Sequence, residues 1–311
     1  MVGKGEHGMR IKDLKKDWIR NRTVYFLALP VIIYFIIWHY IPMAGIVLAF
    51  ENYSARGGVT GSEWVGIDNF LNFFSSYYLK RTLLNTIVIS VYSMIANFPA
   101  PIILALLLNE VENKYFKKVV QTISYMPYFV STVVICGIIV DFFSYNGALT
   151  DVLVNLGLVE RRDLMTYKPL FRPIYVISGT WQMVGYGSII YLAALSGVDQ
   201  ELYEAARIDG AGRWKQTLHI TIPSISPTII IMLILTIGNL LNVAMEKILL
   251  LYRPVTYEVS DVIMTFVYRR GLIEGDYGYS TAVQIFNSVI NLTLLITANA
   301  ISRKYSETSL F

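Results

Sequence analysis

The sequence contains little charge and almost no cysteine. Of its 311 residues, only 15% are Asp, Glu, Lys or Arg, whereas 55% are hydrophobic, and the mean hydropathy is +0.51. A soluble domain needs more polar surface than this composition provides, so the balance indicates a protein of the lipid bilayer. The single cysteine, Cys136, excludes an intramolecular disulfide and any zinc site built from several cysteines.

The chain also lacks the motifs of common nucleotide-binding and hydrolytic sites. There is no G-x-x-x-x-G-K-[ST] loop, so we expect this chain to bind neither ATP nor another cofactor by itself. His7, His39 and His219 are too scattered for a metal or nucleophile–base cluster, and we predict no catalytic residue and no metal site. The net charge of +4 comes from basic residues at the ends of apolar runs, which argues against a nucleic-acid partner.

Six apolar stretches are long enough to cross a bilayer, which takes about 20 residues in a helix. They are Val24–Phe50, Leu83–Leu108, Thr122–Phe143, Pro173–Leu195, Ser224–Ala244 and Thr281–Ile301. An even number of spans places both termini on one side of the membrane. Because the first 22 residues carry seven Lys or Arg, the positive-inside rule predicts that both termini are cytoplasmic.

These spans divide the chain into a membrane domain at 24–303, a cytoplasmic basic leader at 1–23 and a cytoplasmic tail at 304–311. Within the leader, Ile11, Leu14 and Trp18 recur at helical spacing among basic residues. This pattern is typical of a short helix that lies on anionic membrane lipid. The alternative is a disordered basic tail.

The connection before the last span has an unusual pattern. Residues 258–270 hold Val259, Val262, Ile263, Phe266 and Val267 at amphipathic helical spacing. The segment either dips into the outer leaflet or forms a seventh span. We favour the dip, because a seventh span would place one terminus outside.

The cytoplasmic connection 196–223 reads as two short helices. Asp199 is a suitable N-cap for the first, Arg207 falls in its last turn and Gly210 follows as a terminating glycine. A second apolar stripe continues through Trp214, and we expect Pro223 to stop the element at the membrane. Taken singly, each of these residues has an ordinary explanation as a solvated charge, a helix terminator or an interfacial aromatic, so only their joint spacing is informative.

That spacing resembles a known motif. Glu204-Ala205-Ala206, then Gly210 after three residues and Ile220-x-Ile222-Pro223 after nine more, resembles EAA-x3-G-x9-I-x-L-P of binding-protein-dependent ABC import permeases. Ile222 replaces the usual leucine, a change that conserves volume. The resemblance implies a coupling helix that docks in a groove of an ATPase subunit. It assigns ATPase coupling to Glu204, Ala205, Ala206, Asp209, Gly210, Trp214 and Pro223.

Other stretches extend the resemblance over most of the chain. They are Phe26–Ile37 with Tyr40–Met43, Ser124–Phe129, Ser260–Gly271 and Tyr277–Val283. They are similar to carbohydrate-uptake permeases of the maltose type, especially the branch that imports complex polysaccharide fragments. This implies an all-α type I ABC importer transmembrane domain with about six core spans, in the plasma membrane of a prokaryote. It also implies a second permease subunit, two ATPase subunits that hold ATP and Mg²⁺, and an extracellular solute-binding protein.

Polar side chains within the spans raise the question of a solute path. Amides match sugar hydroxyls and aromatic faces cover sugar C–H surfaces, although buried amides also join helices. We predict a path for an oligosaccharide lined by Tyr128, Trp181, Tyr186, Asn239, Asn242 and Glu246. Asn239 and Asn242 are three residues apart, so we expect them on one helical face.

Two other function classes were weighed against this interpretation. An ion-coupled secondary sugar carrier predicts carboxylates deep in the spans, and an intramembrane enzyme predicts a cluster of reactive side chains. The sequence has neither feature. It therefore favours alternating access driven by partner ATPases.

Overall fold

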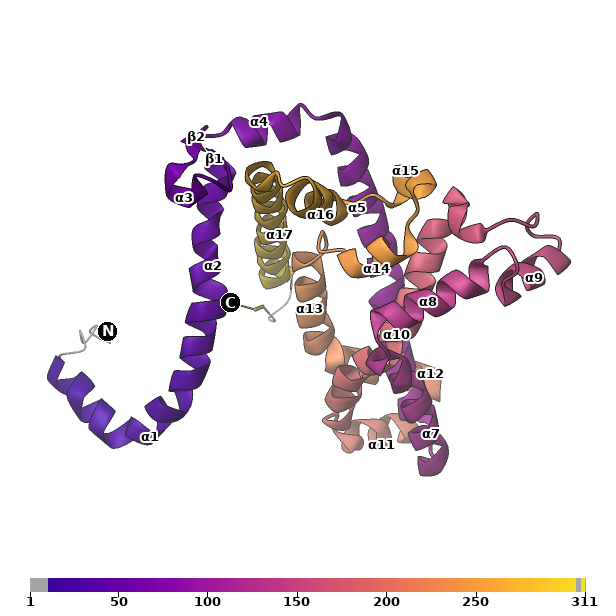
Figure 1. The fold of residues 1–311 in the computed structure, drawn as a ribbon. Helices are drawn as coiled ribbons and strands as arrows, with labels where there is room; N and C mark the ends of the chain where they lie inside the picture. Colours follow the sequence, from indigo (N-terminus) through magenta and orange to yellow (C-terminus); the bar gives the residue numbers. More distant parts are fainter. Residues whose placement is uncertain (1–10, 306–308, 311) are drawn as a thin grey trace.

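Long helices make up most of the computed structural model, which describes residues 11–305 and 309–310 (Figure 1). Within these residues, five helices are long and apolar enough to cross a bilayer: Trp18–Phe50, Tyr77–Glu110, Thr132–Asn155, Arg213–Gly238 and Tyr277–Lys304. A further long helix, α10 (Lys168–Ser196), covers the predicted span Pro173–Leu195 and carries Ser, Thr and Gln in its middle. Residues 1–10 of the predicted leader, and 306–308 and 311 of the predicted tail, lie outside the described residues.

The N-terminal helix bends close to the junction of the predicted leader and the predicted first span. α1 (Ile11–Phe35) contains a non-helical residue, Asn21, with φ −113° and ψ 18°, and Figure 1 shows the helix changing direction near this end. A π-helical turn (Ile36–Tyr40), α2 (Ile41–Met43) and a 3-10 stretch (Ala44–Phe50) continue it. The 3-10 stretch packs on α17 (Tyr277–Tyr305). The described part of the predicted leader, from residue 11 on, is therefore helical apart from the bend at Asn21. Its position on a membrane surface stays a prediction.

The predicted third span, Thr122–Phe143, is not one helix. α7 (Lys114–Tyr125) ends in a 3-10 turn (Met126–Phe129), and α8 (Thr132–Phe143) starts anew after it. Ser131 caps α8, because its side chain accepts a hydrogen bond from the N–H of Val134 at 3.3 Å. The cap and Pro127 explain the break, which apolar content alone does not reveal.

The predicted fifth span was wrong at both ends. α12 (Arg213–Gln216), a π-helical turn (Thr217–Thr221) and α13 (Ile222–Gly238) form one continuous helix, so Pro223 does not stop it. Pro223 lies at the start of α13, directly after the π-helical turn that shifts the backbone hydrogen-bond pattern. At the other end the helix stops at Gly238, before the predicted limit of Ala244.

Short elements connect the long helices, several of them at the end of the molecule opposite α11 (Gln200–Ile208) (Figure 1). They include an antiparallel pair in which Glu51 of β1 faces Trp64 of β2. The elements are β1 (Glu51–Asn52), α3 (Gly58–Gly61), β2 (Glu63–Trp64), α4 (Asp68–Phe74), α9 (Ala148–Asn155), α14 (Met245–Leu251), α15 (Tyr257–Ser260) and α16 (Ile263–Tyr268), with 3-10 turns at Leu164–Thr166 and Pro254–Thr256 and a π-helical turn at Arg269–Ile273. Within 258–270, α15 and α16 are each too short to span a membrane, so the seventh span is not formed.

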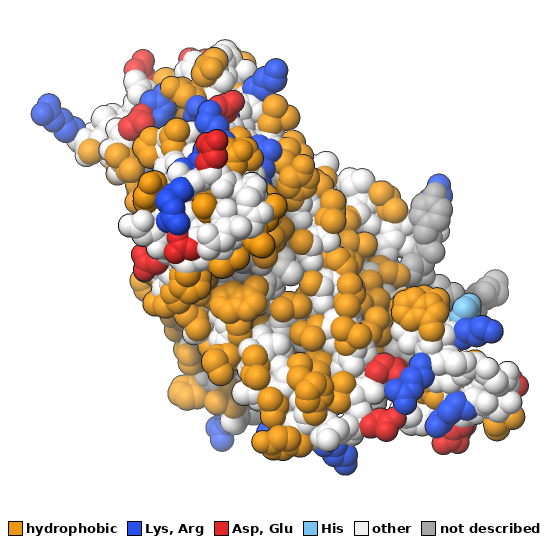
Figure 2. Space-filling view, turned by 90° about the vertical axis from the view of Figure 1, so that its right-hand side faces the viewer, with side chains coloured by type: hydrophobic (Ala, Val, Ile, Leu, Met, Phe, Trp, Pro, Cys, Tyr) orange, Lys and Arg blue, Asp and Glu red, His pale blue; other side chains and the backbone are white. Residues whose placement is uncertain are grey.

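The centre of the fold is α10, which packs against α6 (Pro99–Glu110) and α5 (Tyr77–Asn97), while α13 packs against α17. Ile89 of α5, Tyr175 of α10 and Ile248 of α14 are buried in one apolar cluster where these elements meet. Figure 2 shows charged side chains gathered at two ends of one face, with a mainly hydrophobic band between them. This distribution suits a protein whose middle lies in lipid.

Candidate functional site

The segment with the EAA-like spacing starts and stops as its sequence predicts. The carboxylate of Asp199 caps α11 by accepting a hydrogen bond from the N–H of Glu201 at 3.0 Å. At the other end, Gly210 has φ +74°, the N–H of Ala211 donates to the carbonyl of Ala206 at 2.8 Å, and the N–H of Gly210 donates to that of Arg207 at 3.1 Å. These two bonds form a Schellman motif, which fixes the direction in which the chain leaves α11.

Side-chain contacts attach α11 to the long helices. The hydroxyls of Tyr203 and Thr221 lie 3.0 Å apart and join α11 to the π-helical turn before α13. Arg213, the first residue of α12, joins that helix to the C-terminal end of α6: its guanidinium lies 3.7 Å from the carboxylate of Glu110 and 2.7 Å from that of Glu112, just beyond α6. Through Tyr203, α11 is therefore attached to the helix Arg213–Gly238.

The predicted coupling residues lie at an exposed end of the molecule. At this end Ile208 and Trp214 are large apolar side chains with 87% and 75% of their surface exposed. Ala206 is half-buried, and the remaining predicted coupling residues are exposed: Glu204, Ala205, Asp209, Gly210 and Pro223. The segment thus presents a mixed apolar and charged surface.

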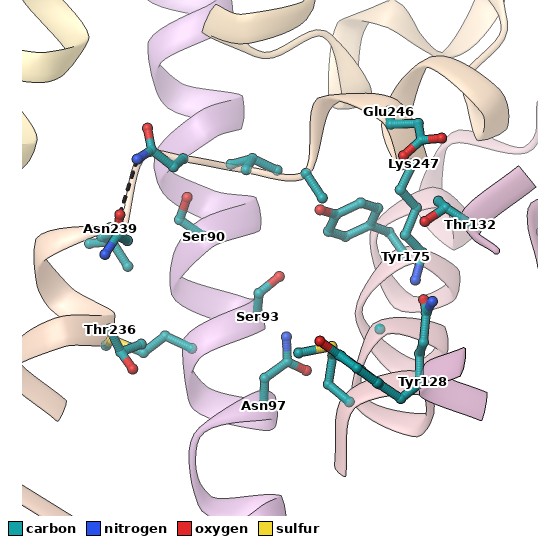
Figure 3. A pocket seen from close by; sticks show the side chains of 18 of the residues that line it. Ser90, Ser93, Asn97, Tyr128, Thr132, Tyr175, Thr236, Asn239, Glu246 and Lys247 are labelled. Atoms are coloured by element: carbon teal, nitrogen blue, oxygen red, sulfur yellow. Dashed lines mark hydrogen bonds between the residues drawn. The ribbon is translucent and has the colours of Figure 1, made fainter. Parts of the chain in front are cut away.

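A cavity of about 670 Å³ lies among α5, α8, α10 and the connection between α13 and α14 (Figure 3). Its wall combines hydroxyls, amides and aromatic rings, including Ser90 and Asn97 of α5 and Tyr175 of α10. Within its lining, Glu246 and Lys247 carry the only charged side chains. A cavity with this lining can form hydrogen bonds to several hydroxyl groups of one solute.

The structure brings four of the six predicted path residues to this cavity, namely Tyr128, Asn239, Asn242 and Glu246. Tyr186 lies behind Tyr128, with the two rings stacked at 3.7 Å and 2° between planes, so it supports the lining ring. Trp181 is not among the lining residues, and 54% of its surface is exposed. The expectation that Trp181 and Tyr186 form one stacking surface in the path therefore differs from their arrangement here.

Asn239 and Asn242 do not share a helical face, as their spacing predicted. α13 ends at Gly238, and both residues belong to the turn that follows, where Asn242 donates to the side-chain oxygen of Asn239 at 3.2 Å. The side-chain oxygen of Asn242 also accepts from Asn287 at 3.2 Å and from Asn291 at 3.0 Å, both on α17. These amides join the turn to α17 and fix its position at the cavity wall.

Asn85, another amide within the spans, joins neighbouring elements. It donates to the backbone carbonyls of Glu258 and Asp261 at 3.0 Å and accepts from Arg172 at 2.8 Å. The buried carboxylate of Asp261 in turn pairs with Arg81 at 2.8 Å and Arg269 at 2.7 Å. This network holds α15 and α16 against α5 and α10.

Among the cavity residues outside the predicted path, three carry buried polar atoms without a hydrogen-bond partner in the described structure: Ser90, Ser93 and Lys247. Ser90 and Ser93 are three residues apart on α5, and both hydroxyls are buried without a hydrogen-bond partner in the described structure. Lys247 is only 4% exposed. The sequence held one indication that Lys247 is buried. The apolar run 248–251 follows it directly, so its side chain has little chance of reaching water along its own helix.

Comparisons with known proteins agree with the fold. Residues 97–307 match the family model of the binding-protein-dependent transport system inner membrane component. The chain is 41% identical to Protein LplB of Bacillus subtilis (strain 168) over 94% of this chain and 92% of that protein. It is 40% identical to the polygalacturonan/rhamnogalacturonan transport system permease protein YteP of the same organism, over 96% and 94%.

A solved structure is also similar. The chain superimposes on one chain of a bacterial alginate ABC transporter, in complex with an alginate pentasaccharide-bound periplasmic protein, with a TM-score of 0.87 and 41% identity. The match covers 95% of this chain and 99% of that one. These similarities give no support to the ion-coupled carrier considered from the sequence. The chain therefore belongs to the binding-protein-dependent transport system inner membrane components, the permease subunits of ABC importers.

Proposed function

We propose that this chain forms part of the pathway by which an ABC importer moves oligosaccharides across the plasma membrane of a prokaryote. The cavity among α5, α8 and α10 is the observation that carries this proposal, because its hydroxyls, amides and aromatic rings suit a hydroxyl-rich solute. The relatives support it, since one is named for polygalacturonan and rhamnogalacturonan and a structural relative transports alginate. In this role Tyr128, Asn239, Asn242 and Glu246 contact the solute directly.

The proposed complex contains a second permease subunit, two ATPase subunits that hold ATP and Mg²⁺, and an extracellular solute-binding protein. Both termini and α11 face the cytoplasm, while β1, β2, α4 and α15 face the solute-binding protein. The basic leader favours this orientation. The exposed Ile208 and Trp214 at the end that carries α11 are consistent with a surface that a partner covers.

Movement of α11 is transmitted to the cavity through one side-chain contact and one long helix. The contact between Tyr203 and Thr221 joins α11 to the helix Arg213–Gly238, whose far end brings Thr236 to the cavity wall. A helix of this size spans about 40 Å at 1.5 Å per residue. Closure of the ATPases would therefore shift the solute cavity as α13 moves with α11, by rigid-body motion.

Purification of the tagged chain from its native membrane tests the proposed assembly. We expect an ATPase subunit and a second permease to co-purify in detergent, and a Trp214→Glu chain to lose the ATPase while it keeps its place in the membrane. Tyr145→Glu, an exposed aromatic that lies outside the coupling segment, is the matched control. Retention of the ATPase by Trp214→Glu would contradict the docking surface.

Uptake by the purified assembly in proteoliposomes tests the solute class. A panel of labelled oligosaccharides, supplied with the solute-binding protein, should enter only when ATP is provided on the ATPase side. The control is an assembly whose ATPase subunits carry a substitution of the phosphate-binding lysine, which should abolish uptake. Uptake driven by an ion gradient without ATP would overturn the proposed function.

A further inference from the structure

Lys247 is a buried cation whose amine has no hydrogen-bond partner in the described structure. The residue is 4% exposed, and its Nζ atom is buried. Figure 3 shows the side chain descending from α14 beside Tyr175, with its nitrogen directed into the cavity. The ring of Tyr175 lies beside it, with its centroid 5.3 Å from Nζ, as does Gly179, where an added Cβ would lie 3.5 Å from Nζ.

The surroundings do not neutralise this charge. An aromatic face attracts an ammonium group but accepts none of its three N–H donors in the way an oxygen does. The other charged residue of the cavity, Glu246, forms no ion pair with Lys247 among the described salt bridges, and Figure 3 shows its carboxylate near the top of the Lys247 side chain, away from the amine at the lower end. Since an unpaired buried charge is costly, this site favours a ligand that brings a negative group.

Two further buried donors face the same cavity. The hydroxyls of Ser90 and Ser93 lack partners, and Figure 3 shows both side chains on the face of α5 that borders the cavity. The cavity thus contains one unpaired cation and two unpaired hydroxyls on different walls. A ligand that satisfies all three carries one anionic group and several hydroxyls on a rigid frame.

We propose that the cavity binds a carboxylate-bearing sugar ring, a uronate unit of an oligosaccharide, with Lys247 pairing with the carboxylate and Ser90 and Ser93 hydrogen-bonding to hydroxyls. This inference rests on the proposed function and makes it more specific. A charge-assisted hydrogen bond in a site shielded from water discriminates strongly between an acid and its neutral ester. Lys247 therefore determines the preference of the permease for acidic over neutral oligosaccharides.

The test compares two ligands that differ only in charge, trigalacturonate and its fully methyl-esterified form. Their binding to the assembled transporter in detergent, without the solute-binding protein, is measured by calorimetry. We expect Lys247→Met to raise the Kd for trigalacturonate about 10- to 100-fold, Lys247→Arg to raise it about threefold, and the Kd for the ester to stay unchanged. Lys80→Met removes an exposed lysine of α5 and should change neither value.

Two results would overturn the proposal. Lys247→Met could bind trigalacturonate as the wild type does, or it could lose the acid and the ester to the same degree, which would indicate a purely structural lysine. If Lys247→Met does not assemble, the wild-type comparison still decides, because equal Kd values for acid and ester would refute the charge preference. If the assembly took up a neutral panel sugar such as maltotriose in preference to trigalacturonate, this inference would be refuted and the proposed function would stand. If it took up no oligosaccharide when ATP is supplied, the proposed function itself would be refuted.

Discussion

The terminator of α11 gives the sharpest prediction about coupling. Gly210 has φ +74°, a region that costs a residue with a Cβ about 1–2 kcal/mol, and an added Cβ would meet no atom within 4 Å. Gly210→Ala therefore carries only the conformational cost, and Gly210→Asn less. Proline cannot adopt positive φ, and it removes the N–H that donates to Arg207 at 3.1 Å.

Gly210→Pro should thus dismantle the Schellman motif. Loss of its two hydrogen bonds costs about 1 kcal/mol each, and the chain can no longer leave α11 in the direction that leads to α12. Because a single described side-chain hydrogen bond, between Tyr203 and Thr221, joins α11 to the helix Arg213–Gly238, we expect its orientation to be lost. The two lost bonds together cost about 2 kcal/mol, which exceeds the 1.4 kcal/mol that corresponds to a factor of ten in the population of the native orientation of α11. Uptake should then fall below about a tenth of the wild-type rate.

Gly212 supplies a matched control two residues away. It has φ −69°, and an added Cβ would again meet no atom within 4 Å. Gly212→Ala should therefore transport normally, Gly210→Ala should retain part of the uptake, and Gly210→Pro should lose nearly all of it with normal membrane insertion. Uptake in proteoliposomes and hydrogen exchange of residues 200–211 are measured for each. Wild-type exchange and uptake in Gly210→Pro would refute the reasoning.

Three further predictions concern coupling, packing and the solute path. Glu204→Lys reverses an exposed charge on the proposed docking surface and should abolish uptake without changing insertion, whereas Glu160→Lys, at an exposed site outside the coupling segment, should transport normally in the same assay. Gly185→Ala places a Cβ 2.0 Å from the carbonyl oxygen of Ser124, so thermal unfolding in detergent should occur at a markedly lower temperature; Gly197→Ala, whose Cβ would lie 3.5 Å from the nearest atom, should differ little. Alanine substitutions at Tyr128, Asn239 and Glu246 should each raise the apparent KM for oligosaccharide uptake several-fold while Trp181→Ala leaves it unchanged; unchanged KM values in the first three would contradict the assigned lining.

The sequence alone determined the features that depend on neighbouring residues. The first, second, fourth and sixth predicted spans fall within long helices, because about 20 consecutive apolar residues have few stable alternatives in lipid. The cap at Asp199 and the terminator at Gly210 were also predictable, since each acts within one helical turn. Likewise the EAA-like spacing identified the family through residues close in the chain.

Only the tertiary structure decided which polar residues meet. Tyr128 stacks on Tyr186, and Asn242 bonds to Asn287 and Asn291, across separations that no local period encodes. Hydropathy carried the predicted fifth span past Gly238, because Leu240, Leu241 and Val243 in the turn are as apolar as helix residues. The role of Lys247 depends on the same information, because an ammonium group is an ordinary surface charge until packing encloses it without a counter-ion, and only the folded arrangement of α5, α10 and α14 does so.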